Sequence, residues 1–382
     1  MALRVQTAVV GAGVVGLAVA RALARRGREV VVLESAASFG TGSSSRNSEV
    51  VHAGIYYGRG SLKARTCVAG RRMLYRYCEQ HGVAIRRCGK LIVATDDSEL
   101  LMLDQIATMA CENGLKGEDE ALRRLTRAEA AAREPEVRCV GALLSPSTGI
   151  VDSHGLMTAL VGDAEAAGCV IAYGTRVRDG RVLRSSGRVL LRTSGATASE
   201  DAALECEEVV NAAGHGAPSV ARSIDGMPSH LLPAAQWAKG SYFGLAAPSP
   251  FRGLVYPVPQ QAGLGVHATV DLGGRCRFGP DVEWITPAAD GALDYAVDPR
   301  RADGFYEEVR KYWPALPDGA LVPDYAGVRP KLQSAGEASR DFCLLGPASH
   351  GVRGLVHLLG IESPGLTASL ALAEAVVEAI ER

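Results

Sequence analysis

The sequence predicts an α/β protein whose parallel sheet is interrupted by a β-rich insertion. Residues 5–34, VQTAVVGAGVVGLAVARALARRGREVVVLE, read as strand, glycine turn, helix and strand, the pattern of a βαβ unit. Residues 209–214, VVNAAG, form a short apolar strand that ends in a second glycine turn, so we expect the chain to return to the first sheet. Between this strand and residue 323 the chain is richer in Pro, Gly and aromatic residues, which favours a β-rich second domain.

The first glycine turn has the spacing of a Rossmann-like dinucleotide site. Gly11 is expected to tighten the bend, Gly13 to admit a pyrophosphate, and Gly16 to let the helix lie against the strand. Glu34 ends the second strand, about 20 residues beyond the turn, where a carboxylate accepts hydrogen bonds from an adenosine ribose. The turn alone fits NAD and FAD equally well.

The remaining elements follow from apolar periodicity and from helix start and stop residues. Ser153 is expected to cap one helix, and Pro364 to open the last one. We expect helices at residues 62–81, 98–113, 119–135, 153–167 and 364–380, and strands at 89–94, 169–173, 175–182 and 207–214. The alternating composition predicts a discontinuous dinucleotide domain (1–85, 145–217 and 325–382) and a substrate domain (86–144 and 218–324).

Composition narrows the class of protein. The chain has 382 residues with 47% hydrophobic residues, enough for two domains with large cores. Its net charge of −1 provides no global basic field, so no nucleic-acid partner is expected. Nine cysteines without a CxxC pair indicate reduced thiols and no metal site. The reduced thiols predict a cytoplasmic protein. No apolar run reaches the roughly 20 residues of a transmembrane helix, so no membrane span is expected, and peripheral membrane contact is left open.

The polar loop after Glu34 is too long for a simple connection, and long ordered loops are usually functional. Its side chains Ser44, Arg46, Asn47 and Ser48 supply hydroxyl, guanidinium and amide donors for pyrophosphate and ribityl groups.

Several motifs resemble known flavoproteins. The 11–34 spacing and VVNAAG resemble the D-amino-acid oxidase-like superfamily of FAD-dependent oxidoreductases. Four longer motifs are similar to the L-2-hydroxyglutarate dehydrogenase/oxidase family; they are SSSRNSEVVHAGIYY (43–57), SLKAR (61–65), GVRPKL (327–332) and HLLGIESPGLTASLA (357–371). Glu49 departs from the small residue of some members, and Gly58-Arg59 departs from a proline-containing pair.

This resemblance implies a Rossmann-like, GR2-type FAD-binding domain with an inserted β-rich substrate domain, and a noncovalently bound FAD. It implies oxidation of a 2-hydroxy acid, foremost L-2-hydroxyglutarate to 2-oxoglutarate, with hydride transfer to flavin N5. The expected FAD-binding residues are Gly11, Gly13, Val14, Val15, Gly16, Glu34, Ser44, Arg46, Asn47, Ser48, Val177, Ala213, Gly214, Gly360, Ile361, Glu362 and Ser363.

Oxidation of a hydroxy acid also needs a base and cations. A neutral histidine is well matched to the base, and the resemblance implies that His52 and His267 both face the reactive side of the flavin; which of them is the base stays open. Arg329 is expected to grip a carboxylate, because the guanidinium fork holds both oxygens. Lys239 is a second cation for a distal carboxylate, and Tyr256 could donate its hydroxyl.

Other functions fit parts of the pattern. An FAD-dependent oxidase of amino acids or secondary amines, of the glycine or sarcosine type, is the main alternative. An NAD-dependent dehydrogenase or a non-catalytic nucleotide-binding protein is a third. The sequence leaves the electron acceptor open among oxygen, a quinone and an electron-transfer protein.

Overall fold

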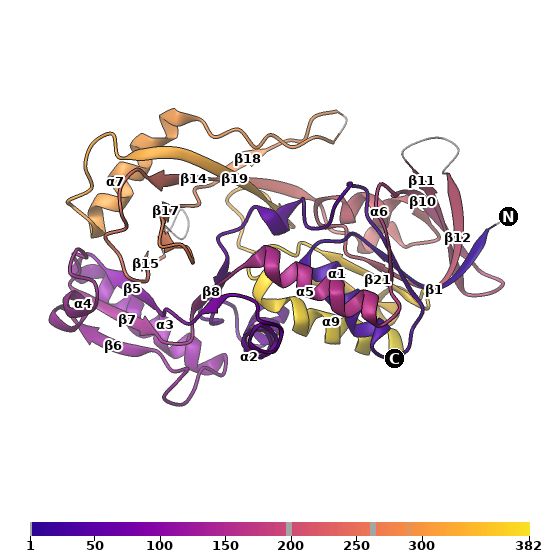
Figure 1. Ribbon diagram of the computed structural model, residues 1–382, viewed down its shortest axis with the longest axis horizontal. Coiled ribbons are helices and arrows are strands. Elements are labelled where there is room, and N and C mark those ends of the chain that lie inside the picture. Colours follow the sequence, from indigo (N-terminus) through magenta and orange to yellow (C-terminus); the bar gives the residue numbers. More distant parts are fainter. Residues whose placement is uncertain (1, 196–200, 260–264, 290) are drawn as a thin grey trace.

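The computed structural model describes residues 2–195, 201–259, 265–289 and 291–382. Within these residues the strands form two nine-stranded sheets and one three-stranded sheet (Figure 1). The first sheet contains β13 (Ile224–Asp225), β10 (Arg176–Leu183), β11 (Arg188–Ser194), β12 (Ala202–Asn211), β1 (Leu3–Val10), β2 (Val30–Leu33) and β9 (Val170–Ala172) in that order, with β21 (Leu355–Leu359) on β12 and β20 (Cys343–Leu345) on β21.

The second sheet lies at the other end of the molecule (Figure 1). Its order is β18 (Glu283–Ile285), β14 (Gln236–Leu245), β17 (Cys276–Phe278), β16 (Ala268–Val270), β15 (Leu254–Pro257), β5 (Lys90–Ala94), β7 (Gly141–Ser145) and β6 (Arg123–Thr126), with β19 (Leu321–Lys331) on β14. The small sheet joins β3 (Val50–Val51), β8 (Gly149–Val151) and β4 (Ile85–Arg86).

The glycine turn joins β1 to α1 (Val14–Ala24) as the sequence predicts. β1 pairs in parallel with β2 on one side and with β12 on the other, so VVNAAG does return to the first sheet. Gly11 has a φ of +101°, and a Cβ there would lie 2.7 Å from the carbonyl oxygen of Ala212. A Cβ on Gly16 would collide with the carbonyl oxygen of Gly11. These two glycines are therefore demanded by the fold itself.

Helices α1, α5 (Ser153–Ala166) and α9 (Gly365–Glu381) pack side by side against the first sheet, and α2 (Leu62–His81) lies against α9 (Figure 1). Gly70 makes the α2–α9 contact close, because a Cβ there would meet the backbone of Thr367 and Ala368. The other helices are α3 (Leu100–Glu112), α4 (Arg127–Arg133), α6 (Ala217–Ser223), α7 (Ala302–Tyr312) and α8 (Pro347–His350). The α/β class that the sequence predicts is confirmed.

Three local expectations differ from the structure. The helix expected at 119–135 is shorter, because Thr126 and Glu129 form a capping box that starts α4, while the preceding residues pair as β6 with β7. The cap of α5 is Asp152, whose carboxylate accepts the backbone N–H of Gly155 at 2.9 Å, and Ser153 is the first helical residue. β19 crosses the domain boundary expected at residue 325 and pairs with β14 on both sides of it.

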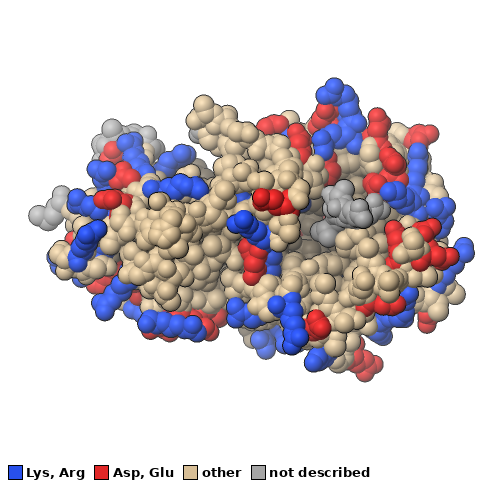
Figure 2. Space-filling view, turned by 180° about the vertical axis from the view of Figure 1, so that it is seen from behind, with Lys and Arg blue, Asp and Glu red and all other residues tan. Residues whose placement is uncertain are grey.

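The described residues contain no helix that is long and apolar enough to cross a membrane. Figure 2 shows Lys and Arg side chains interspersed with Asp and Glu over the face that it presents. This distribution agrees with the near-zero net charge of the sequence and offers that face no broad basic surface.

Candidate active site

A cavity of about 600 Å³ runs from the glycine turn to strands of the second sheet. Most residues that the sequence singles out lie in its wall; they are Gly11, Gly13, Val14, Val15, Glu34, Ser44, Arg46, Asn47, Ser48, His52, Val177, Ala213, Gly214, Tyr256, His267, Arg329, Ile361, Glu362 and Ser363. Gly16, Lys239 and Gly360 are not among the lining residues. Segments far apart in the sequence therefore converge on one cavity, large enough for a sizeable ligand.

At one end the cavity meets the N-terminus of α1. The N-cap residue, Gly13, has no side chain to cap this helix, and Ser44 takes only the N–H of Val14, so the next N–H groups of the first turn are available to an anion. Gly13 has an ordinary φ of −74°, and a Cβ there would have a single close neighbour, the hydroxyl of Ser44 at 3.2 Å. Unlike Gly11 and Gly16, Gly13 is thus not demanded by the protein's own packing. Its missing side chain leaves room for a phosphate group beside the helix end.

The carboxylate of Glu34 is fixed at the same end. It accepts the backbone N–H of Ala12 at 2.7 Å and that of Ala36 at 2.8 Å. These bonds hold the side chain against the glycine turn, and each carboxylate oxygen keeps a further lone pair. The position suits the ribose-binding role that the sequence predicts.

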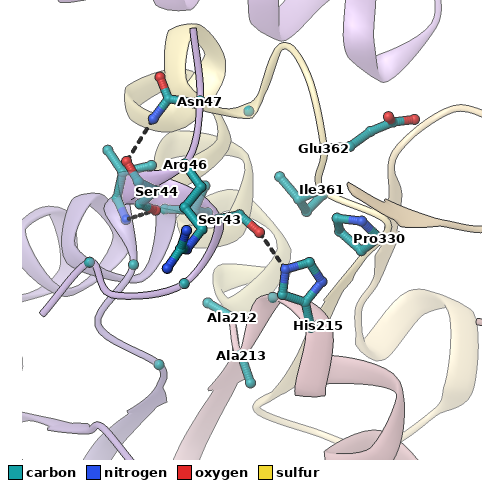
Figure 3. A pocket seen from close by; sticks show the side chains of 18 of the residues that line it. Ser43, Ser44, Arg46, Asn47, Ala212, Ala213, His215, Pro330, Ile361 and Glu362 are labelled. Atoms are coloured by element: carbon teal, nitrogen blue, oxygen red, sulfur yellow. Dashed lines mark hydrogen bonds between the residues drawn. The ribbon is translucent and has the colours of Figure 1, made fainter. Parts of the chain in front are cut away.

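The loop after Glu34 folds over the helix end (Figure 3). The hydroxyl of Ser44 accepts the backbone N–H of Val14 at 3.0 Å, and the amide of Asn47 donates to the carbonyl of Ser44 at 2.6 Å. The guanidinium of Arg46 lies 4.1 Å from the ring centre of Tyr295. Ser44 and Asn47 therefore shape the loop in addition to lining the cavity.

His215 is a lining residue that the sequence analysis did not single out. Its Nε2 lies 2.7 Å from the hydroxyl of Ser43 (Figure 3), and burial lowers its pKa to about 4, so the ring is neutral near pH 7. The signal was its position directly after the VVNAAG turn, at the carboxyl end of a central strand.

Glu49, the residue that departs from the family pattern, connects the loop after Glu34 to helix α5. It has a φ of +56°, and its carboxylate accepts both the backbone N–H of Ser153 at 3.0 Å and the Ser153 hydroxyl at 2.8 Å. The side chain therefore ties the loop to the start of α5.

The other end of the cavity holds the two histidines. His52 follows β3; its backbone N–H donates to the hydroxyl of Thr367 at 3.0 Å, and its Nε2 lies 3.3 Å from the hydroxyl of Ser363. Burial, and next the positive charge of Lys90, lower the pKa of His52 to about 3, so the imidazole is neutral near pH 7. His267 is buried and stacks on Tyr256, with ring centroids 3.5 Å apart.

The two predicted cations are placed differently. Arg329 lines the cavity and donates to the backbone carbonyl of Asp281 at 2.8 Å and to that of Ala238 at 3.4 Å. Within the described residues these bonds use two of the five N–H donors of the guanidinium, which leaves donors for a carboxylate. Lys239 is buried, and its ammonium pairs with Asp294 at 2.7 Å.

Glu362 lies in the cavity wall just before α9, where an isolated negative charge would oppose anion binding. Its carboxylate pairs with Lys63 at 3.1 Å and with Lys331 at 2.7 Å. Burial disfavours ionisation of Glu362, but the two ammonium groups outweigh it and hold its pKa below the ordinary value. Two positive charges and one negative charge leave this cluster with a net positive charge.

Two more residues near the cavity, Lys90 and Tyr242, are not among the site residues that the sequence predicts. Tyr242 lines the cavity from β14. Lys90 starts β5 and is only 2% exposed, with its ammonium 4.4 Å from the ring centre of Tyr256. A lysine at the head of the apolar run KLIVA was a usable signal, because lysine is seldom fully buried.

Comparisons with a family model and with related sequences both find oxidoreductases. Residues 6–379 match the family described as FAD dependent oxidoreductase. The chain is 47% identical to the L-2-hydroxyglutarate dehydrogenase, mitochondrial, of Arabidopsis thaliana, over 97% of this chain and 82% of that protein. It is 30% identical to the protein of the same name from Nematostella vectensis, over 97% of this chain and 89% of that protein.

Solved structures agree in fold. The L-alpha-glycerophosphate oxidase of Mycoplasma pneumoniae with FAD bound superposes with a TM-score of 0.86 at 22% identity, covering 99% of this chain and 95% of the other. The glycine oxidase of Geobacillus kaustophilus superposes with a TM-score of 0.79 at 23% identity, covering 100% and 95%. At these identities the likeness concerns the fold alone.

Proposed function

Because this chain belongs to the FAD dependent oxidoreductase family, together with the L-2-hydroxyglutarate dehydrogenases, we propose that it oxidises L-2-hydroxyglutarate to 2-oxoglutarate. FAD is its cofactor, and the chain is an enzyme, as the sequence predicts. One observation supports the reaction above all. The cavity that contains most of the expected FAD-binding residues also contains His52, His267 and Arg329.

The residues present fit FAD. The N–H groups in the first turn of α1 beyond Val14 and the open space beside Gly13 suit the pyrophosphate, and Glu34 suits the adenosine ribose. Ser363 lies beside His52 just before α9, so residues 361–363 would hold the isoalloxazine end. When bound, FAD supplies the hydride acceptor for the reaction. Noncovalent attachment stays a prediction.

The chain's own residues would bind the acid and move its hydroxyl proton. Arg329 would hold the carboxylate next to the reacting carbon. His52 would take the proton from the substrate hydroxyl, because its imidazole is neutral and its Nε2 is oriented by Ser363. His267, stacked on Tyr256, would form part of the wall of the reacting volume.

An amino-acid or secondary-amine oxidase is the weaker alternative. The glycine oxidase is only 23% identical to this chain, and at that identity the similarity supports a shared fold but not a shared substrate. By contrast, the 47% identity to the A. thaliana dehydrogenase extends over nearly the whole chain.

The test is anaerobic bleaching of the bound flavin. Purified protein should be yellow, and L-2-hydroxyglutarate should bleach it faster than D-2-hydroxyglutarate, L-lactate, glycine or sarcosine. Bleaching by the amines alone would replace our proposal with the amine oxidase, and colourless protein that binds NAD would remove both. Reoxidation of the bleached protein by oxygen or by a soluble quinone then identifies the electron acceptor.

The compartment also stays a proposal. All nine cysteines are free, as a reducing compartment requires. The two plant and animal relatives compared above carry the word mitochondrial in their names, so the cytoplasmic location suggested by the sequence is a prediction that cell fractionation tests.

A further inference from the structure

Lys90 is the buried lysine that the proposed mechanism does not use. It begins β5 and is 2% exposed. Within the described part of the chain its ammonium has no carboxylate within ion-pair distance, whereas the other buried or nearly buried lysines each have one: Lys63 and Lys331 share Glu362, and Lys239 has Asp294. A buried cation without a counter-ion is costly unless an anion comes to it.

Two aromatic rings partly compensate the charge. The ammonium lies 4.4 Å from the ring centre of Tyr256 and 4.9 Å from that of Tyr56. Cation–π contacts of this kind contribute about 1–2 kcal/mol, less than the burial of an ammonium costs. Accordingly, burial lowers the pKa of Lys90 to about 7, against the opposing influence of Cys67. The site is therefore ready to gain from a nearby negative charge.

Lys90 is not itself among the residues that line the cavity, but it lies directly behind Tyr256 at the histidine end. Leu254 pairs with Lys90 and Tyr256 with Ile92, so the side chains of Lys90 and Tyr256 lie on the same face of the second sheet. Tyr256 lines the cavity and stacks on His267. Lys90 is also close enough to His52 to act on it electrostatically. Its positive charge thus lies next to Tyr256 and near His52, in the wall of the cavity that His267 and Arg329 also line.

We propose that Lys90 supplies the positive charge for the second carboxylate of the substrate, and so makes the site select dicarboxylates over monocarboxylates. The inference rests on the proposed function for the identity of the substrate. In this arrangement Arg329 holds the carboxylate next to the reacting carbon, and Lys90 attracts the distal one. Lys239, the distal cation expected from the sequence, is already neutralised by Asp294.

The experiment compares two ligands of equal chain length. 2-Oxoglutarate has two carboxylates and 2-oxopentanoate has one, and the binding of each is followed by the change in the absorption spectrum of the bound FAD. In Lys90→Met the ratio of the two dissociation constants should move toward unity by at least about tenfold, the loss expected for one charge-assisted contact. Affinity for 2-oxopentanoate should change less than threefold, and Lys90→Arg should restore part of the preference.

Lys239→Met is the matched control. It also removes a buried lysine of the second sheet, but one with a carboxylate partner, so the ligand preference should stay as in the unmodified protein. A preference unchanged in Lys90→Met, or lost equally in Lys239→Met, overturns the inference.

A measurement on the unmodified protein covers the case in which Lys90→Met does not fold. The sequence has only six lysines, so protein labelled with ¹³C at the lysine ε carbons gives few signals, assigned by arginine variants of the other five. The ¹³C resonance of Lys90 should change its chemical shift when 2-oxoglutarate binds and keep its chemical shift when 2-oxopentanoate binds. Equal shifts with both ligands overturn the inference.

The two proposals fail separately. If the protein prefers 2-oxoglutarate through Lys90 and yet L-2-hydroxyglutarate does not bleach its flavin, the proposed reaction is wrong and the role of Lys90 stands. If bleaching occurs and the preference ignores Lys90, only the present inference is wrong. Protein with bound FAD that binds neither oxo acid refutes both.

Discussion

Replacing Gly13 by valine separates a glycine needed for FAD from glycines needed for folding. At Gly11 a Cβ would lie 2.7 Å from a backbone oxygen in a left-handed conformation, and at Gly16 it would collide with backbone. At Gly13 the backbone is extended, with φ −74° and ψ 171°, and the only close neighbour is the hydroxyl of Ser44 at 3.2 Å. Valine should therefore cost the FAD-free protein no more than about 1 kcal/mol.

The cost to the FAD complex is larger. The valine methyl groups would occupy the space beside the N-terminal end of α1, so a pyrophosphate would lose at least one charge-assisted hydrogen bond and part of the helix-end attraction. These terms are worth about 1.5–3 and about 1 kcal/mol. Their sum, roughly 3 kcal/mol, weakens FAD binding by on the order of 100-fold.

The assay is titration of FAD into stripped protein, followed by flavin fluorescence, together with thermal unfolding of the same samples. Gly162→Val is the control, since Gly162 lies in α5 with nothing within 4 Å of a Cβ. Gly13→Val should unfold within a few degrees of the unmodified protein without FAD but lose the stabilisation that FAD brings. Undiminished FAD affinity in Gly13→Val would refute the placement of the pyrophosphate at this turn.

Three further predictions concern the reactive end. His52→Asn should keep its flavin and reduce kcat by about 10²–10⁴-fold, as loss of a general base does; a kcat within threefold of the original would assign the base elsewhere. Arg329→Met should mainly raise KM for L-2-hydroxyglutarate, and an unchanged KM would count against its carboxylate role. Glu362→Gln should lower the free energy of unfolding by about 3 kcal/mol, because it leaves Lys63 and Lys331 buried without a counter-ion. In the unmodified protein folding lowers the pKa of Glu362, so its stabilisation is present above the ordinary pKa of 4.5 and is lost as pH falls through the folded value. Urea unfolding between pH 3 and 7 measures this loss. If the free energy of unfolding of Glu362→Gln falls with pH as steeply as that of the unmodified protein, the prediction is wrong.

Local signals in the sequence were sufficient for much of the fold. The helix expected at 62–81 matches α2, because its ends are coded locally: the hydroxyl of Ser61 accepts the N–H of Ala64, and Gly82 ends the helix with a φ of +64°. The βαβ unit was equally readable, since the three glycines and the apolar strands lie within 30 residues. Where Thr126 caps a helix inside a charged, alanine-rich stretch, the composition hid the cap and the helix was predicted too long.

The site residues that the sequence missed depend on contacts between distant segments. Lys239 and Lys90 look alike in sequence, both being lysines in apolar strands of the second sheet. They differ because Asp294, 55 residues beyond Lys239, folds back onto its ammonium, while no such carboxylate reaches Lys90 in the described residues. Neither fact has a local signal. The family motifs located the cavity wall, but the pairing of charges within it is a property of the tertiary structure.

The charge balance at the histidine end bears on the choice between a hydroxy acid and an amine. The sequence alone suggests that Glu362 would repel an anion at this end. Its negative charge is outweighed by the charges of Lys63 and Lys331, and Arg329 and Lys90 add further positive charge. The α9 N-terminus adds its dipole in the same direction. A dianion such as L-2-hydroxyglutarate gains from every one of these groups, and so does negative charge that develops on a reduced flavin. A zwitterionic amine would bring its ammonium into the same field, where Glu362, the carboxylate that the described residues place at this end of the cavity wall, is already paired with Lys63 and Lys331. The electrostatics of the cavity therefore favour the dicarboxylate hydroxy acid on grounds independent of the family relationship.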